Sequence, residues 1–420
     1  MKSNLIKRGF LSLIVTQFFG AANDNVLKQV LTFMVATGIW ANALGEGGQS
    51  YVGLCLTLPF IFLSGYAGQI ADRVSKRRVI VAVKIAEVPI AIIAMVGFWM
   101  QSLWLTLAAM LLLATQSAFF GPAKYGVIPE LVDDSDLSRA NGTINMLTNV
   151  AIILGALVGG PLADLYHPKP DKTGAVAEPL LWIPGAALLC IAIAGLFTSL
   201  AMPRMKAQDP GLRFDWNPIG TYLKAVVEMA RGPMLIVAAA WSFFYMIGMM
   251  ALLALPKYEH ILQITYTQTS YLLGVLGISI ACGSITAGLV SGHAIRPILI
   301  PIGAGGMAAS FLMLGTVQPE FWSVAIMLFA AGFFAGFYII PLQALLQKLS
   351  PTDERGRFLG TANAISFCFS SLGSVLYLIL VNRIGMPANR VFLVCSGLIV
   401  IITGYVIWRL RPILRRHAIP

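Results

Sequence analysis

Apolar residues in this chain gather into long runs that short polar segments separate. We find about twelve such runs, and each is long enough for the roughly 20 apolar residues that a membrane-spanning helix needs. The runs cover residues 10–38, 50–71, 78–100, 103–127, 143–166, 180–202, 233–256, 269–291, 295–316, 321–347, 357–382 and 389–410. The pattern predicts an all-α polytopic membrane protein with about twelve transmembrane helices.

Charged and amide side chains interrupt the first of these runs. Asp24 and Lys28 lie four residues apart, so on a helix they share one face and can pair. A charged side chain at the centre of a spanning helix costs roughly 2.5–3.5 kcal/mol, so we expect this face to meet protein or a watered cavity instead of lipid. Small or polar residues continue the same stripe: Gln17, Gly20, Asp24, Lys28 and Thr32. The stripe predicts a cavity beside the first helix, and a buried structural pair is the alternative.

The composition supports a membrane protein. Of the 420 residues, 58% are hydrophobic and 11% are charged, and the mean hydropathy is +0.80, whereas soluble domains carry about 25% charged residues. The net charge of +11 could suggest a nucleic-acid partner. With a cytoplasmic amino terminus, however, few basic residues fall within or outside the membrane: Lys28, Lys169, Lys172, Lys257, Arg383 and Arg390. We therefore expect both termini in the cytoplasm, contact with membrane lipids and no nucleic-acid partner.

Cysteine and histidine show no spacing typical of a metal or catalytic site. All five cysteines fall within apolar runs, and the four histidines are scattered, mostly at loops. We expect no metal, no cofactor and no enzymatic activity, since an enzyme would need catalytic groups clustered near one interface. Ala41-Asn42-Ala43 resembles a signal cleavage site, but the apolar run before it is far longer than the roughly 7–15 residues of a signal core. We expect that run to be retained.

A polar linker divides the predicted helices into two sets. We place the N-terminal six-helix half at residues 1–202, the linker at 203–232 and the C-terminal six-helix half at 233–420. In the linker, Asn217-Pro218 is a typical helix start, and apolar positions follow on one face: Ile219, Tyr222, Leu223, Val226 and Ala230. This pattern predicts an amphipathic helix on the inner membrane surface, and a plain solvated linker is the alternative.

Landmarks of the first half recur in the second at nearly the same offset. Gly68 and Gly288 each begin a polar loop, and Pro122 and Pro341 each lie near the end of an apolar run. Such a spacing indicates a duplication with parallel orientation. Parallel six-helix repeats with a substrate site at their interface are typical of rocking transporters.

The loop after the second run resembles the signature of the major facilitator superfamily. Residues 68–78 have the sequence Gly-Gln-Ile-Ala-Asp-Arg-Val-Ser-Lys-Arg-Arg, which departs from the signature at Ser75, where the family usually has glycine. Gly68 would let helices approach closely, and the basic residues favour a cytoplasmic loop. The resemblance implies a major facilitator fold in which Asp72 contacts the eleventh helix near Gly356 and stabilises the outward-open state. We assign Gly68, Asp72 and Arg73 to gating, with a purely topogenic loop as the alternative.

Four further segments resemble the bacterial lysophospholipid transporter family. They are Gln17-Phe18 with Asn23-Asp24-Asn25, residues 121–131 with Pro-Ala-Lys-Tyr-Gly at 122–126, Ala140-Asn141-Gly142 and residues 340–347. Members of that family move lysophospholipid, chiefly lysophosphatidylethanolamine, from the outer to the inner leaflet of the bacterial cytoplasmic membrane, where an acyltransferase re-acylates it. The resemblance implies the same function for this chain, with the acyltransferase acting in trans. We expect a monomer.

The resemblance also implies a charged niche for the lipid head and an apolar wall for the tail. Asp24 would hold an ammonium group and Lys28 a phosphate, and amide side chains would add hydrogen bonds. Two aromatic residues of the seventh helix would belong to the wall, although ordinary packing is the alternative for them. We assign substrate binding to Asn23, Asp24, Asn25, Lys28, Trp241 and Tyr245, and a gating role to Lys124.

One position departs from the family pattern. There, the aspartate that matches Asp24 pairs with a basic residue of the seventh helix, but residues 233–256 contain neither Lys nor Arg. Lys28 is the candidate substitute, although a pair within one helix would not join the two halves.

A proton-coupled exporter of small amphiphiles, such as drugs or metabolites, is the alternative function, because a fold alone does not fix the substrate. In such an exporter Glu87 would carry the proton. It could equally pair with Lys84, which precedes it by one helical turn.

Overall fold

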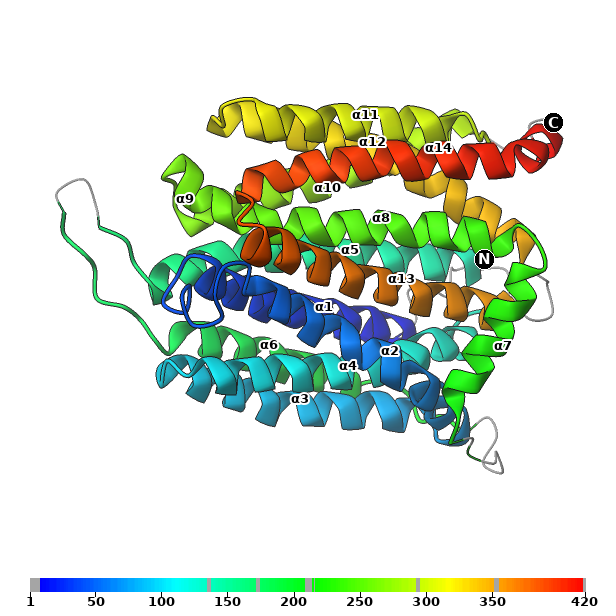
Figure 1. The fold of residues 1–420 in the computed structure, drawn as a ribbon. Helices are drawn as coiled ribbons and strands as arrows, with labels where there is room; N and C mark the ends of the chain where they lie inside the picture. Colours follow the sequence, from blue (N-terminus) through cyan, green and yellow to red (C-terminus); the bar gives the residue numbers. More distant parts are fainter. Residues whose placement is uncertain are drawn as a thin grey trace. The chain divides into compact units, whose positions relative to one another are not determined.

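The computed structural model describes residues 8–133, 137–170, 174–207, 214, 216–291, 295–350 and 355–417. Helices dominate this part of the chain, and none of its residues lies in a strand (Figure 1). The helices are α1 (Arg8–Ala36), α2 (Gln49–Arg73), α3 (Lys76–Trp99), α4 (Leu103–Leu131), α5 (Leu137–Tyr166), α6 (Ile183–Leu200), α7 (Pro218–Ala230), α8 (Met234–Ala254), α9 (Tyr258–Leu262), α10 (Tyr266–Ser291), α11 (Leu299–Thr316), α12 (Phe321–Leu349), α13 (Arg355–Leu378) and α14 (Val391–His417). Each predicted apolar run forms one of the long helices.

Eleven helical segments of the described residues are long and apolar enough to cross a membrane, judged by length and composition. Helix α1 is not among them, although it has 29 residues. Its central Asn-Asp-Asn and Lys28 lower its mean hydropathy. For this reason the first predicted run, unlike the others, is less apolar than a typical membrane-spanning helix. The all-α polytopic class is confirmed.

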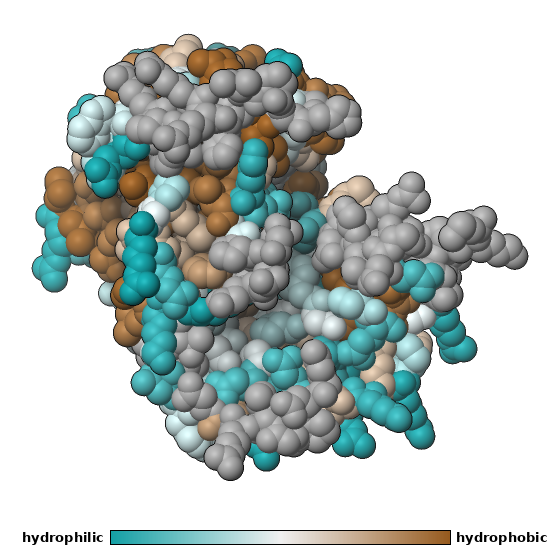
Figure 2. Space-filling model, turned by 90° about the vertical axis from the view of Figure 1, so that its right-hand side faces the viewer, coloured by the Kyte–Doolittle hydropathy of each residue, from teal (hydrophilic) through white to brown (hydrophobic). Residues whose placement is uncertain are grey.

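Large apolar side chains are exposed along many of these helices. Phe62 is 56% exposed, Ile85 55% and Ile326 69%. The face in Figure 2 shows such brown apolar side chains next to teal hydrophilic ones. In a membrane protein, exposed apolar side chains along a helix are the surface that contacts lipid.

Helix α7 confirms the helix predicted from Asn217-Pro218. Its packing differs from the expected face, because Ala225 and Met229 are buried whereas Leu223 is 60% exposed. Glu228 on the helix accepts a hydrogen bond from Arg357 of α13 at 2.8 Å. The helix therefore packs on one side and leaves a second apolar edge, with Leu223 and Val227, exposed. Its place on the membrane surface stays a prediction.

The described chain groups into two compact units. The N-terminal unit contains residues 1–40, 55–219 and 265–270, and the C-terminal unit contains residues 41–54, 220–264 and 271–420. The half boundaries predicted at 202 and 233 stay a prediction. In the N-terminal unit, α1 packs against α4, α5 and α6, and α3 packs against α4 and α6.

The C-terminal unit repeats this pattern of neighbours. Helix α8 packs against α12, α13 and α14, and α11 packs against α12 and α14. Each of these five contacts of the N-terminal unit thus has its counterpart six transmembrane helices later, with α8 in the place of α1 and α11 in the place of α3. This correspondence supports the duplication that the sequence landmarks indicate.

Candidate functional site

Helix α1 carries its polar stripe among the helices of the N-terminal unit. Gln17 donates a hydrogen bond to Thr148 of α5 at 2.9 Å. Thr16 and Thr198 of α6 lie at hydrogen-bond distance, 3.0 Å. Asp24 accepts a hydrogen bond from Ser117 of α4 at 2.8 Å. The prediction that Asp24 faces protein is confirmed, since its partner belongs to a neighbouring helix.

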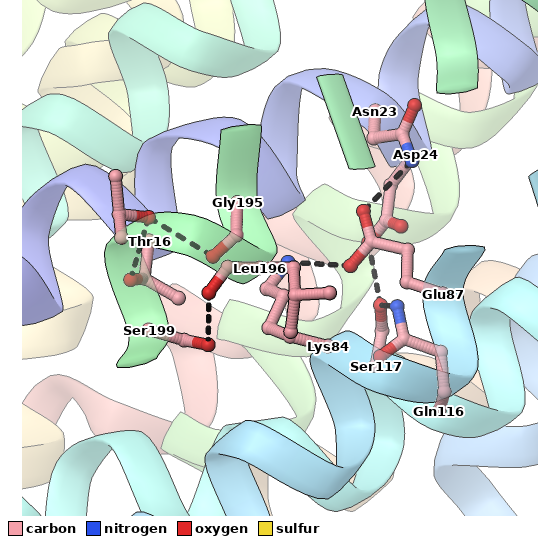
Figure 3. A network of polar contacts seen from close by, with 11 residues as sticks. Thr16, Asn23, Asp24, Lys84, Glu87, Gln116, Ser117, Gly195, Leu196 and Ser199 are labelled. Carbon is pink, nitrogen blue, oxygen red and sulfur yellow. Dashed lines mark hydrogen bonds and ion pairs between the residues drawn. The ribbon is translucent and has the colours of Figure 1, made fainter. Parts of the chain in front are cut away.

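A buried polar cluster lies where α1, α3 and α4 meet; its members are Asn23, Asp24, Lys84, Glu87, Gln116 and Ser117 (Figure 3). Lys84 Nζ and Glu87 Oε2 are 2.5 Å apart, and Asn23 Nδ2 donates to Glu87 Oε1 at 2.7 Å. Lys84 is 1% exposed and Glu87 0%. The expected Lys84–Glu87 pair is confirmed, and both carboxylate oxygens of Glu87 have a partner.

Two features make room for the buried ammonium of Lys84. A Cβ atom at Gly20 would lie 2.5 Å from Lys84 Nζ, so any larger residue there would force the ammonium to shift away from its present position. The ring of Phe120 lies with its centroid 5.4 Å from the same nitrogen, within the range of a cation–π interaction. A buried ion pair is tolerated only when hydrogen bonds and close packing offset its loss of hydration.

The predicted Asp24–Lys28 ion pair is wrong. Lys28 Nζ donates to Asn25 Oδ1 at 2.7 Å, while Asp24 Oδ2 accepts from Ser117, and no ion pair joins Asp24 and Lys28 among the residues that the structure describes. Each charged group has another hydrogen-bond partner instead. Lys28 donates to Asn25 on the same helix, and Asp24 accepts from Ser117 on α4. Both side chains are half-buried, so part of their surface stays accessible.

Three acceptor atoms in or beside the polar cluster lack a hydrogen-bond partner among the residues that the structure describes. They are Asn23 Oδ1, Asp24 Oδ1 and Gln116 Oε1, and all three are buried. Gln116 is joined to Asp24 through Ser117, because its Nε2 donates to Ser117 Oγ at 3.2 Å. An unpaired buried polar atom costs about 1–3 kcal/mol, so each of these three atoms would be stabilised by a hydrogen-bond donor.

Three of the residues predicted to take part in gating, Gly68, Asp72 and Arg73, lie in the last two turns of α2. Asp72 and Arg73 are exposed there. The close helix approach expected at Gly68 is not found, because a Cβ atom there would meet no described atom within 4 Å. The contact predicted between Asp72 and the helix near Gly356 stays a prediction, and the surroundings of Gly356 lie outside what the structure describes.

Basic residues after α2 have structural partners that sequence analysis did not identify. Lys76 Nζ lies 2.6 Å from Glu130 Oε1 of α4. Arg77 donates to the carbonyl oxygen of Met202 at 2.7 Å and to that of Leu200 at 3.1 Å. These contacts tie α3 to the ends of α4 and α6, since a cation at a helix C-terminus satisfies free carbonyl groups.

Lys124 lies on α4, is 7% exposed and has its Nζ 4.4 Å from the ring centroid of Tyr125. Its charge and that of Asp24 attract each other electrostatically. Lys124 therefore belongs to the charged surroundings of the polar cluster, and its assignment to gating stays a prediction.

The remaining predicted residues lie on α8, in the C-terminal unit. Trp241 and Tyr245 form an edge-to-face pair with ring centroids 5.0 Å apart. Trp241 is 9% exposed, and its Nε1 donor has no partner among the described residues. The structure thus groups Asn23, Asp24, Asn25 and Lys28 on one helix, with Lys124 in the same unit, and it places the aromatic pair in the other unit.

Ser117 and Gln116 are the members of the cluster that sequence analysis missed. The signal was present, because Thr-Gln-Ser at residues 115–117 interrupts an otherwise apolar run. That signal alone did not identify a partner, since a serine in a helix often bonds to its own backbone.

The chain is similar in sequence to known membrane transporters. The family model described as Major Facilitator Superfamily matches residues 10–374 and, in a second match, residues 242–418. The lysophospholipid transporter LplT of Pectobacterium carotovorum is 28% identical over 86% of this chain and 82% of its own length. That of Escherichia coli strain K12 is 27% identical over 99% of this chain and 98% of its own length.

Solved structures show the same fold at low identity. The nucleoside transporter NupG has a TM-score of 0.73 at 13% identity, covering 95% of this chain and 98% of that one. A bacterial homologue of the human lysosomal transporter Spinster, in an inward-facing and occupied conformation, has a TM-score of 0.71 at 14% identity, covering 97% and 96%. The predicted transporter fold is confirmed.

Proposed function

This chain belongs to the Major Facilitator Superfamily, and on that premise we propose that it is a lysophospholipid transporter. It moves lysophosphatidylethanolamine-like lipids from the outer to the inner leaflet of the bacterial cytoplasmic membrane by alternating access. An acyltransferase acting in trans then re-acylates the lipid. The names of relatives that align over most of the chain support this substrate class.

The observation that carries the proposal is the set of unpaired acceptors at Asn23, Asp24 and Gln116. A primary ammonium group presents three donors and a positive charge. It therefore matches three acceptors, one of which is a carboxylate oxygen. Phosphoethanolamine is a lipid head with such a group, and its ammonium binds at these atoms.

The phosphate of the head is held by lysine. The Nζ of Lys28 has three donors, and the bond to Asn25 uses one of them. Lys124 adds a second ammonium in the electrostatic surroundings of Asp24. Lysine binds phosphate as a compact charge that needs no fixed geometry, which suits a lipid head that has to leave the site again.

Trp241 and Tyr245 contact the less polar part of the substrate. The indole Nε1 of Trp241 is a buried donor, and the ester carbonyl of a lysolipid would accept its hydrogen. Gating belongs to Gly68, Asp72, Arg73 and Lys124. The carrier is a monomer with both termini in the cytoplasm, as the distribution of basic residues favours, and it has no enzymatic activity of its own.

Reconstituted vesicles test the proposal. Purified protein is placed in vesicles that enclose an acyltransferase, and lysophosphatidylethanolamine is added outside, so that inward movement is measured as diacyl lipid formed. We expect formation well above that of protein-free vesicles, and rates equal to that control would refute the function.

A comparison of head groups tests the role of the acceptors. Asp24→Asn should reduce transport of lysophosphatidylethanolamine more than transport of lysophosphatidylglycerol, because the second lipid has no ammonium. Glu178→Gln, which makes the same chemical change in an exposed loop, is the matched control. Equal losses of transport for both lipids would show that Asp24 does not bind the ammonium group.

Proton-coupled export of a small amphiphile remains the second candidate. Glu87 is the buried carboxylate that would carry a proton, but Lys84 and Asn23 occupy both its oxygens. Transport of a water-soluble amphiphile that stops when the pH gradient is dissipated, with no competition from lysolipid, would favour this candidate.

A further inference from the structure

Glu87 of α3 determines which end of the Asn23 side chain is available on α1. An asparagine amide has an amino group that donates hydrogen bonds and a carbonyl oxygen that accepts them. The amino nitrogen, Nδ2, donates to Glu87 Oε1 at 2.7 Å. The carbonyl oxygen, Oδ1, points away from Glu87 and is buried without a hydrogen-bond partner among the described residues (Figure 3). Asn23 therefore presents its acceptor end.

The second asparagine beside Asp24 shows a different arrangement. Asn25 Nδ2 donates to the carbonyl oxygen of Ala21 at 2.8 Å, and Asn25 Oδ1 accepts from Lys28 at 2.7 Å. Both ends of that amide are thus engaged within α1. Asn23 is held at one end, and its partner belongs to another helix. Of the two amides, Asn23 is the one whose orientation the tertiary structure sets.

A carboxylate is the partner that fixes this orientation, because it accepts hydrogen bonds and donates none. It can bind the amino group of Asn23 and cannot bind its carbonyl oxygen. Lys84 engages the second oxygen of Glu87, with Nζ and Oε2 2.5 Å apart. The ammonium is enclosed in turn by Gly20 of α1 and by the ring of Phe120 on α4. The carboxylate is therefore held in one position.

Stability alone does not account for this ion pair. Lys84 is 1% exposed and Glu87 0%. A buried ion pair contributes little compared with apolar side chains of similar volume, because both charges lose their hydration. Apolar residues could fill the same space among α1, α3 and α4, but they could not orient the amide of Asn23.

We propose that Glu87, held by Lys84, is a positioning residue for substrate recognition, which directs the carbonyl oxygen of Asn23 toward the ammonium group of the lipid head. The inference rests on the proposed function for the identity of the ligand. A flipped amide would direct its amino group at the ammonium, so that repulsion would replace a hydrogen bond. Glu87 acts through Asn23, since Lys84 and Asn23 engage both oxygens of the carboxylate.

A series of side chains at position 87 tests the inference. Lys84→Met, Glu87→Gln places an amide there, which can donate or accept, so about half of the Asn23 side chains should present the wrong end. The exchange Lys84→Glu, Glu87→Lys keeps a pair of opposite charges and places a donor at position 87, so Asn23 should present its amino group. Lys257→Met, Glu46→Gln makes the same neutral changes at an exposed ion pair and is the matched control.

Uptake is measured in the vesicles described above and is corrected for the amount of folded protein. We expect lysophosphatidylethanolamine uptake to fall about twofold in the neutral variant. In the exchange variant it should fall about tenfold to a hundredfold, the effect of a lost hydrogen bond to a charged group. Uptake of lysophosphatidylglycerol, which has no ammonium, should fall less, and the control should keep the wild-type values. Equal uptake by all folded variants would overturn the inference, although the transport function stands.

A rescue variant separates positioning from a purely structural role, and it keeps the test valid if the exchange variant does not fold. Asn23→Asp, Glu87→Gln retains one buried carboxylate for Lys84 and gives position 23 an oxygen at both ends, so its orientation no longer matters. We expect lysophosphatidylethanolamine uptake near the wild-type value. Uptake below that of the neutral variant would contradict the inference.

Binding of the head group separates the inference from the proposed function. Water-soluble glycerophosphoethanolamine is titrated against the purified protein, and the rise in melting temperature reports its binding. We expect a rise for the wild type and the rescue variant, and a smaller one for the exchange and neutral variants. This result without any vesicle transport would refute the proposed function and keep the inference, whereas an equal response of wild type and variants would overturn the inference.

Discussion

The two units share one pattern of helix contacts and differ in what their interiors contain. In the N-terminal unit, α1, α3 and α4 enclose Asp24, Lys84 and Glu87 with amide and hydroxyl partners. In the C-terminal unit, α8, α11 and α12 occupy the corresponding positions, and together with α10 and α14 they line a small apolar cavity with residues such as Phe244, Gly248 and Met307. One scaffold thus supports a charged interior in one copy and a hydrocarbon-like interior in the other.

Because helix contacts depend on small residues and shape, a duplicated bundle can change its interior chemistry while its helix neighbours stay the same. The following predictions test this comparison, from the largest expected effect to the smallest.

Removing one partner of the buried Lys84–Glu87 ion pair should cause the largest loss in the free energy of unfolding. Lys84→Met leaves the Glu87 carboxylate buried without its cation, which is expected to lower the free energy of unfolding by about 3–5 kcal/mol. Denaturant titration in mild detergent measures this. The double variant Lys84→Met, Glu87→Gln removes the charge and keeps an acceptor for Asn23, so it should recover most of the loss. If the single variant is as stable as the wild type, the cluster does not stabilise the N-terminal unit.

Neutralising Asp24 should affect transport and leave stability nearly unchanged. Asp24→Asn is expected to reduce lysophosphatidylethanolamine uptake by about tenfold to a hundredfold, the effect of a lost charged hydrogen bond. Ser117 keeps an acceptor in this variant, so the yield of folded protein should match the wild type. Wild-type uptake would assign Asp24 a structural role and weaken the contrast between the units.

A glycine-to-alanine substitution should lower the stability in the N-terminal unit at Gly20 and raise it in the C-terminal unit at Gly248. Gly20→Ala brings a Cβ atom to 2.5 Å from Lys84 Nζ and should cost about 1–3 kcal/mol through overpacking. Gly248→Ala meets open space and should gain up to about 1 kcal/mol from helix propensity. Thermal unfolding of both variants in one detergent checks the prediction, and a loss of stability for Gly248→Ala would contradict the open cavity.

Breaking an exposed ion pair of the C-terminal unit should cause the smallest change in the free energy of unfolding. Lys257 Nζ lies 3.0 Å from Glu46 Oε2, and the Glu46 side chain is 66% exposed. Lys257→Met should change the free energy of unfolding by less than about 1 kcal/mol, because solvent screens the pair. The same denaturant titration as for Lys84→Met compares the two pairs directly, and similar losses would show that burial does not set the difference.

The helices could be predicted from sequence because their cause is local. An apolar run of sufficient length has to form a helix in a membrane, where backbone groups find no water to bond. The predicted runs 103–127 and 321–347, for example, became α4 (Leu103–Leu131) and α12 (Phe321–Leu349). The helix of the linker was found in the same way, from a cap and a periodic apolar face.

Partner choice within the site could not be predicted as well. Asp24 and Lys28 have the spacing of a pair, but the partner that decided the position of Asp24 is Ser117, on another helix. Gly68 carries the family motif without a close neighbour, whereas Gly20, which no motif marks, is the glycine that accommodates a buried lysine. Spacing along one helix shows which residues share a face and does not show which neighbour that face meets.

The sequence by itself determined that this chain is a helical membrane protein built from two related halves, with charges in a segment that lipid would exclude. Those properties depend on hydropathy and on residues near one another in the chain. Only the tertiary structure decided that Lys84 and Glu87 are buried beside Asn23, and that helices of the C-terminal unit line a small apolar cavity. The physical reason is that both results depend on how side chains of several helices fill a shared volume, which no single helix specifies.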